Sequence, residues 1–247
     1  MNRFRHLLAG AAALLLAATA QAQERRTTHD SDLRARVSIA LTKQFGRHSI
    51  TLDEELRLKD DWAQLDRIQT TLSYACDFGP WFKAAAFYAL IANDRGAGCS
   101  IEMRHRFYLE LTASYRTGAW CFSLRERPQT TLRTAQVDPA VTARSAWVLR
   151  HRVQVEYAVS GTGFKPYVFV ELTQTLNAPT VGNYLEKVRS SLGLKYAFDK
   201  RSSLEGYYRF DYKITDKPVF DEFSAVDFIA SERGSHHIIG LEYGYKF

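Results

Sequence analysis

Long apolar runs are missing from this sequence once its first 22 residues are set aside. No later stretch approaches the roughly 18 apolar residues that a membrane-spanning helix needs, and the mean hydropathy is -0.29. These absences exclude a helical membrane protein. They do not argue against a transmembrane β-barrel, because half of each barrel strand faces a polar interior and an averaged hydropathy hides the lipid face.

Cysteine is scarce, and the cysteines are not spaced as metal or redox ligands. Cys76, Cys99 and Cys121 lie far apart, and no Cys-x-x-Cys pair occurs. We therefore expect no metal and no cofactor. A disulfide can form, but nothing in the sequence requires one.

The first segment is typical of a secretory signal peptide. Arg3 and Arg5 precede an apolar run from Leu7 to Ala18, and the small tripeptide Ala20-Gln21-Ala22 follows. We expect cleavage after Ala22 and export to the bacterial outer membrane. The residue directly after the cleavage point is Gln23 and not a cysteine, so a lipoprotein is not indicated. A mature N-terminal segment over 23–33 would then precede a barrel over 34–247.

The overall charge gives no sign of a nucleic-acid partner. The formal net charge of +6 falls to +4 when the two arginines of the signal segment are removed. That excess is too small to indicate nucleic acid, which an exported protein rarely meets.

The mature sequence is a series of segments in which apolar and polar residues alternate, as in half-buried strands. In 103–115, for example, Phe107, Leu109 and Leu111 share one face, and the charged residues share the other. Such segments lie near 35–45, 49–59, 65–77, 81–92, 102–116, 119–130, 146–159, 164–175, 184–198, 202–214 and 236–247. Their lengths suit tilted strands that cross a membrane.

The connections between these segments alternate between short and long. Short turns face the periplasm in outer-membrane barrels, which predicts outer loops near 60–64, 93–101, 131–145, 176–183 and 215–235. The final segment ends in alternating aromatic residues, with Tyr243, Tyr245 and Phe247 on one face. It resembles the terminal strand that the barrel-assembly machinery recognises.

The strand number is left open. Bacterial single-chain barrels have an even number of antiparallel strands, whereas about eleven segments alternate. Either 34–45 is not part of the wall, which leaves ten strands from His48 onward, or a weak strand within 23–33 makes twelve. We therefore expect an all-β, up-and-down antiparallel transmembrane β-barrel of about 10–12 strands.

Charged residues recur on the faces that should point into the lumen. The runs Arg104-His105-Arg106, Arg125-Glu126-Arg127 and Arg150-His151-Arg152 each place two arginines inward. The expected lumen lining is Arg57, Arg67, Arg104, Arg106, Glu110, Arg125, Arg127, Arg150, Arg152, Glu156, Glu171, Arg189, Arg209 and Glu242. Such a lattice either selects anions in a narrow pore or fills the barrel as a plug.

The expected lipid face carries a few polar exceptions. His105, Glu126 and His151 fall at corresponding heights, and Glu54 and Glu186 also interrupt the apolar row. Because a charge at mid-bilayer costs a few kcal/mol, we expect these groups at the headgroup level, against lipopolysaccharide phosphates or their bridging cations.

The same exceptions allow an alternative, an outer-leaflet lipid hydrolase of the lipid A deacylase or phospholipase type. In it, a histidine polarised by a carboxylate would activate a serine. Ser123 and Ser191 face inward, and Ser190 is distant in strand order. We therefore expect no enzyme and no catalytic residues.

Several segments together resemble the domain of unknown function 2490 family. They are "SITLDEELRLKDD", "LDRIQTTLSY", "EMRHRFYLELTASYRTGAWCFSLRERPQ", "LRHRVQVEY", "KPYVFVEL" and "HHIIGLEYGYKF". The most specific elements are Glu54-Glu55-Leu56-Arg57, Leu65-Asp66-Arg67, the Arg-x-Arg pairs and Lys165-Pro166-Tyr167. The resemblance implies an outer-membrane-type β-barrel of unassigned activity and adds no catalytic residues.

These patterns predict a passive outer-membrane role, either a narrow anion-preferring channel or a closed structural barrel with a charge-filled lumen. The expected partners are outer-membrane lipid and lipopolysaccharide, the assembly machinery during biogenesis, and small anionic solutes. Adhesion or docking through the outer loop over 215–235 is a further alternative.

Overall fold

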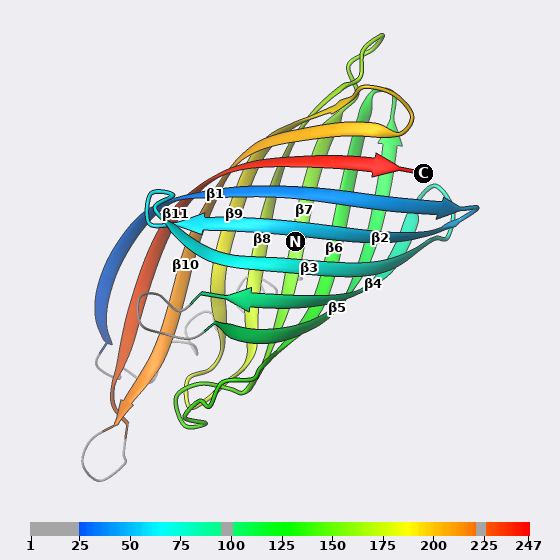
Figure 1. Cartoon of the computed structure of the whole chain (residues 1–247). Helices are drawn as coiled ribbons and strands as arrows, with labels where there is room; N and C mark the ends of the chain where they lie inside the picture. Colours follow the sequence, from blue (N-terminus) through cyan, green and yellow to red (C-terminus); the bar gives the residue numbers. More distant parts are fainter. Residues whose placement is uncertain (1–24, 95–100, 221–225) are drawn as a thin grey trace, which may run out of the picture.

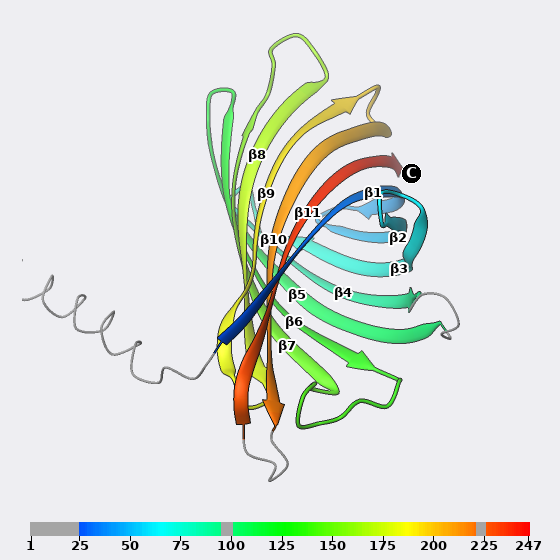
Figure 2. The ribbon, with the colours of Figure 1, turned by 90° about the vertical axis from the view of Figure 1, so that its left-hand side faces the viewer.

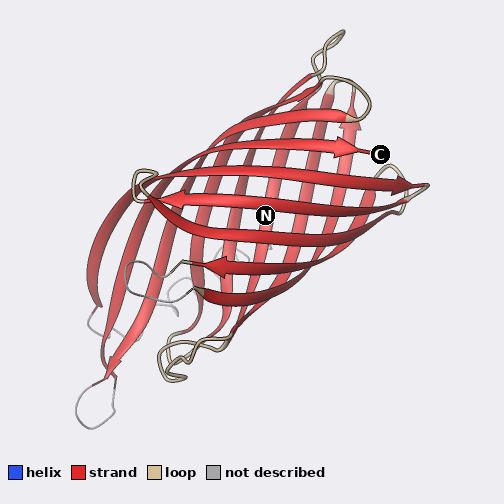
Figure 3. Ribbon diagram, in the orientation of Figure 1, coloured by secondary structure: helices blue, strands red, loops and turns tan. Residues whose placement is uncertain are grey.

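The computed structural model describes residues 25–94, 101–220 and 226–247, which form a closed all-β barrel (Figures 1 and 3). The expected signal peptide, residues 1–22, lies outside the described residues. Within the described ranges, no helix is long and apolar enough to cross a membrane. The strands that the structure describes are β1 (Arg25–Phe45), β2 (His48–Lys59), β3 (Gln64–Asp77), β4 (Phe82–Asn93), β5 (Glu102–Thr117), β6 (Trp120–Arg133), β7 (Ser145–Tyr157), β8 (Phe164–Ala178), β9 (Gly182–Ala197), β10 (Ser202–Phe220) and β11 (Val226–Lys246).

The alternation in the sequence builds the barrel wall. In β5, Phe107, Leu109 and Leu111 point outward and are exposed, whereas Tyr108 and Glu110 between them line the interior. Each strand pairs with its neighbours in chain order, so the expected up-and-down barrel is confirmed. An apolar exterior around a charged interior is the pattern of a transmembrane barrel.

The barrel closes through a parallel pair, so the expectation of an even strand number is wrong. β1 pairs with β11 in parallel from Arg25↔Ile229 to Thr42↔Lys246. Residues 34–45 are therefore part of the wall, and residues 25–33 extend the same strand instead of forming a twelfth. A parallel ladder also pairs the backbone groups of both strands, so an odd number closes the barrel without an open edge in hydrocarbon.

Short turns gather at one end of the barrel. The β1–β2 and β5–β6 turns begin with Gly46 and Gly118, whose φ values of 61° and 56° suit tight hairpins. The Phe247 N–H donates to the Thr42 carbonyl (3.0 Å), so β11 ends there too. Because short turns face the periplasm in this class, we call this the periplasmic end and the opposite one the outer end.

The expected outer loop over 215–235 is wrong. β10 and β11 remain paired from Lys213↔Gly234 to Val219↔Phe228, and the start of β1 continues the sheet beside them. These three strands lie side by side at the outer end (Figures 1 and 2). Shorter connections at the outer end cover 60–63, 134–144 and 179–181. Residues 95–100, within the expected loop 93–101, lie outside the described residues.

Aromatic side chains ring the periplasmic end of the outer wall. Trp81 and Tyr115 are largely exposed, and the ring centroids of Trp120 and Tyr157 lie 4.8 Å apart. Their amphipathic rings suit the membrane–water interface. The apolar wall therefore has a marked boundary at this end.

Candidate functional site

The inward faces of the strands surround a charged cavity of about 830 Å³. Its lining includes sixteen Arg or Lys residues and seven Asp or Glu residues. The cations are Arg34, Arg36, Arg57, Lys59, Arg67, Arg104, Arg106, Arg125, Arg127, Arg133, Arg150, Arg152, Lys187, Arg189, Arg209 and Lys213. The lumen therefore presents a strong excess of positive charge to a small solute.

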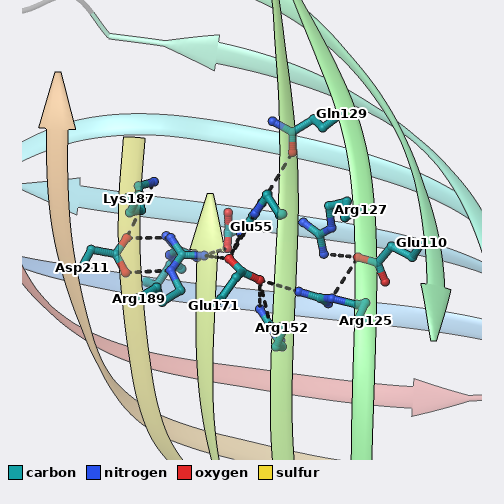
Figure 4. A network of polar contacts seen from close by, with 12 residues as sticks. Glu55, Glu110, Arg125, Arg127, Gln129, Arg152, Glu171, Lys187, Arg189 and Asp211 are labelled. Atoms are coloured by element: carbon teal, nitrogen blue, oxygen red, sulfur yellow. Dashed lines mark hydrogen bonds and ion pairs between the residues drawn. The ribbon is translucent and has the colours of Figure 1, made fainter. Parts of the chain in front are cut away.

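Glu171 is the centre of the charge arrangement in the wall. Its fully buried carboxylate accepts hydrogen bonds from Arg125 (Nη2, 2.7 Å), Arg152 (Nε, 2.9 Å), Arg150 (Nε, 3.1 Å) and Arg189 (Nη1, 3.3 Å). The arginines come from β6, β7 and β9, the strands around β8 (Figure 4). Because charge-assisted bonds satisfy both carboxylate oxygens, this buried charge is compensated.

Two further carboxylates extend these contacts around the wall. Arg189 makes a bidentate pair with Asp211 on β10, with both nitrogen–oxygen distances 2.6 Å. On the other side, Glu110 of β5 contacts Arg127 and lies 3.2 Å from Arg125. We call Arg125, Arg127, Arg150, Arg152 and Arg189 with Glu110, Glu171 and Asp211 the arginine lattice. Its five arginines and three carboxylates leave it positively charged.

Aromatic rings support the guanidinium groups inside the lumen. The Arg152 Cζ lies 3.8 Å from the ring centroid of Phe169, and the Arg209 Cζ lies 4.3 Å from that of Tyr207. Tyr207 itself packs over Gly240 of β11, where an added Cβ would collide with its ring. These stacked contacts hold long side chains in place and stabilise their charge.

Four lumen cations have no carboxylate within ion-pair distance in the described part of the chain: Lys59, Arg106, Arg209 and Lys213. Arg106 donates instead to neutral groups, to Thr131 Oγ1 (3.1 Å) and Gln69 Oε1 (3.5 Å). All four line the cavity. Their charges are therefore the ones least cancelled by the protein itself.

Charge is also ordered along the barrel axis. β2 runs toward the outer end and passes Asp53 before Arg57, and β10 passes Glu205 before Arg209. Glu205 lies directly opposite Glu242 in the register of the neighbouring strands β10 and β11. On β2, Arg57 therefore lies nearer the outside than the acidic side chains, whereas on β10 acidic Asp211 follows Arg209 and the two signs alternate.

A family model described as "Protein of unknown function (DUF2490)" matches residues 24–220. The chain belongs to this family. The resemblance seen in the sequence is thus confirmed. No curated protein matches the chain. A solved structure described as "NanC porin structure in rhombohedral crystal form" is similar at 13% identity and a TM-score of 0.45, over 87% of this chain and 99% of that chain.

The structure of this DUF2490 protein places twelve of the fourteen expected lining residues on the cavity. Glu171 instead lies buried beneath the arginines that it binds. Glu156 lies outside the cavity lining and pairs with Lys195 (2.9 Å).

Sequence reasoning missed several cations and misplaced one carboxylate. Arg34 and Arg36 line the cavity from β1, the strand whose place in the wall was in doubt. Glu186, expected on the lipid face, lines the lumen and accepts a hydrogen bond from Thr175 (3.1 Å). A register shift after Thr173 in the β8–β9 pair turns it inward. A bulge of this kind leaves no reliable mark in the alternation.

The outward histidines of this DUF2490 barrel are hydrogen-bonded across strands. Tyr88 pairs with His105 (2.9 Å) and Tyr208 with His237 (2.6 Å). His151 Nδ1 lies 2.5 Å from Glu126 Oε2. Both residues are at the middle of their strands, a position that favours the membrane interior over the expected headgroup level.

The described residues hold no cluster of three or more His, Cys, Asp or Glu that could bind a metal ion. Cys76 and Cys121 are free thiols, and Cys99 lies outside the described residues.

Proposed function

We propose that this DUF2490 protein is an outer-membrane channel that prefers small anions. The observation that carries the proposal is the excess of sixteen cationic over seven anionic side chains around the lumen cavity. Rings of Arg or Lys lower the electrostatic barrier for anions in a narrow pore. The apolar exterior and the closed wall support a location in the outer membrane.

Two groups among the lumen cations differ in how far the protein cancels their charge. Four lattice arginines are held by the buried Glu171, so they act as part of the wall. Arg106, Arg209 and Lys213 line the cavity without a carboxylate partner in the described chain. A passing anion can therefore interact with their charge without first displacing a protein carboxylate.

The test is the reversal potential of single channels in planar bilayers under a tenfold KCl gradient. An anion-selective pore gives a reversal potential with the sign of the chloride equilibrium potential. Its magnitude has an upper limit of about 59 mV. Changing Arg106, Arg209 and Lys213 together to Gln should move this potential at least halfway toward zero. A control variant with Arg47, Lys200 and Arg201 changed to Gln loses the same charge from the periplasmic turns and should move it much less.

A closed structural barrel is the second candidate, and the lattice is the observation that favours it. Arginines of β6, β7 and β9 converge on one carboxylate of β8, which ties adjacent strands together inside the lumen. Folded protein that shows heat-modifiable migration but no conductance would support this role over the channel. Cation-selective openings would contradict the anion channel.

The proposed role is not enzymatic. A lipid hydrolase would need a nucleophile beside the outward histidine. Within the described residues, His151 contacts Glu126 and no Ser or Thr hydroxyl is hydrogen-bonded to it. Release of fatty acid from lipopolysaccharide or phospholipid by the purified protein, lost on changing His151 to Ala, would contradict this part of the proposal.

A further inference from the structure

The lipid face of β6 and β7 carries a polar pair halfway across the membrane. Glu126 and His151 each lie six residues from the periplasmic end of their strand, and their side chains are both 37% exposed. His151 Nδ1 contacts Glu126 Oε2 at 2.5 Å, whereas His151 Nε2 and Glu126 Oε1 have no hydrogen bond in the described chain. Exposed polar groups at this depth are costly in hydrocarbon.

The backbone beside this pair is also incompletely bonded. The β5–β6 ladder passes from Tyr108↔Gln129 to Leu111↔Glu126 with no paired position between them. Pro128, which has no N–H to donate, lies in this gap. Unpaired backbone groups are unfavourable against lipid, so the two defects coincide on one patch of the wall.

An apolar hollow adjoins the polar pair on the same face. It measures about 430 Å³ and is lined in part by Trp81, Tyr115, Phe122 and Val153. The register sets Leu124↔Val153 two residues from Glu126↔His151 on the same pair of strands. Val153 is 60% exposed, so the patch combines a projecting side chain, a hollow and a polar pair.

We propose that this patch is the interface of a symmetric dimer of the chain. Two copies inserted in the same direction are related by a two-fold axis along the membrane normal, which brings equal depths face to face. Glu126 and His151 are at equal depth, so His151 of each copy meets Glu126 of the other. As an imidazolium, His151 has a second N–H for the other copy's carboxylate, and the four groups alternate in charge.

A second copy of the chain offers hydrogen-bond partners that lipid cannot provide. Acyl chains offer no hydrogen-bond partner to His151 Nε2 or Glu126 Oε1, whereas a second copy offers both. The Val153 side chain of one copy faces the hollow of the other across the same axis. The dimer is independent of the channel proposal, because none of these outward residues lines the lumen cavity.

Sedimentation equilibrium in density-matched micelles tests the dimer directly. The E126L/H151L variant removes both polar groups and should raise the dimer dissociation constant at least tenfold. The swapped variant E126H/H151E keeps every Glu–His pair, so its dimer dissociation constant should stay within about threefold of the wild-type value. The control is E54L, which removes an outward glutamate that also lies six residues from the periplasmic end of its strand, on β2, and it should have no effect.

Cross-linking in lipid vesicles provides a second measurement. In a chain whose native cysteines are changed to Ser, V153C should form a disulfide-linked dimer, whereas L72C, outward on β3, should not. A monomeric wild type, or a dimer that E126L/H151L leaves intact, would overturn the proposal. Equal loss of dimer in E54L would overturn it as well. Heat-modifiable migration of every variant checks that the barrel has folded.

Discussion

Changing Glu171 to Gln tests whether the arginine lattice holds the barrel together. The substitution keeps the size of the side chain but removes the charge that four arginines share. Glu171 is fully buried, so those guanidinium groups cannot turn to water without disturbing the wall. Removing one member of a buried ion pair costs about 3–5 kcal/mol, and we expect the free energy of unfolding to fall by that amount.

Urea unfolding of the protein in lipid vesicles, followed by tryptophan fluorescence, measures this loss as a shift in midpoint at constant slope. The matched control is Glu110→Gln, since Glu110 contacts two arginines and remains 13% exposed. Its loss should cost about 1.5–3 kcal/mol. A Glu171→Gln variant within 1 kcal/mol of the wild type, or no worse than the Glu110 variant, would refute the structural role. The same variant leaves the lattice more positive, so its openings should be more anion-selective.

Two further predictions concern the packing of the wall and its turns. Gly240→Ala places a Cβ against the ring of Tyr207, whereas the Cβ of Gly206→Ala meets no atom within 4 Å. Gly240→Ala should therefore lower the free energy of unfolding by about 1–3 kcal/mol. An equal loss of unfolding free energy in Gly206→Ala would contradict the packing argument. In the β9–β10 turn, the Asp199 carboxylate accepts hydrogen bonds from the backbone N–H groups of Arg201 and Ser202, which lowers its pKa below the usual 3.8. Its stabilising contribution is therefore present above the unfolded-state pKa and lost as the pH falls through the lower folded-state value, and an NMR titration giving Asp199 an unshifted pKa would contradict this.

The sequence by itself determined which side of the wall most residues face. Side chains alternate along a strand with a period of two, so the pattern around Arg104, Arg106, Arg150 and Arg152 assigned them to the lumen before any pairing was known. The same alternation gave the segments and the barrel class. These properties are local, because each depends only on a residue's neighbours along its own strand.

Only the tertiary structure decided how the barrel closes and which charges meet. Residues 25–33 are largely polar and carry no clear alternation, yet they form a strand because β11 provides a partner edge for their backbone. Glu186 turns inward through a bulge in the β8–β9 register. The four arginines around Glu171 come from three different strands. Such contacts depend on the register between strands and on the curvature of the wall. The order of residues within one strand determines neither of these.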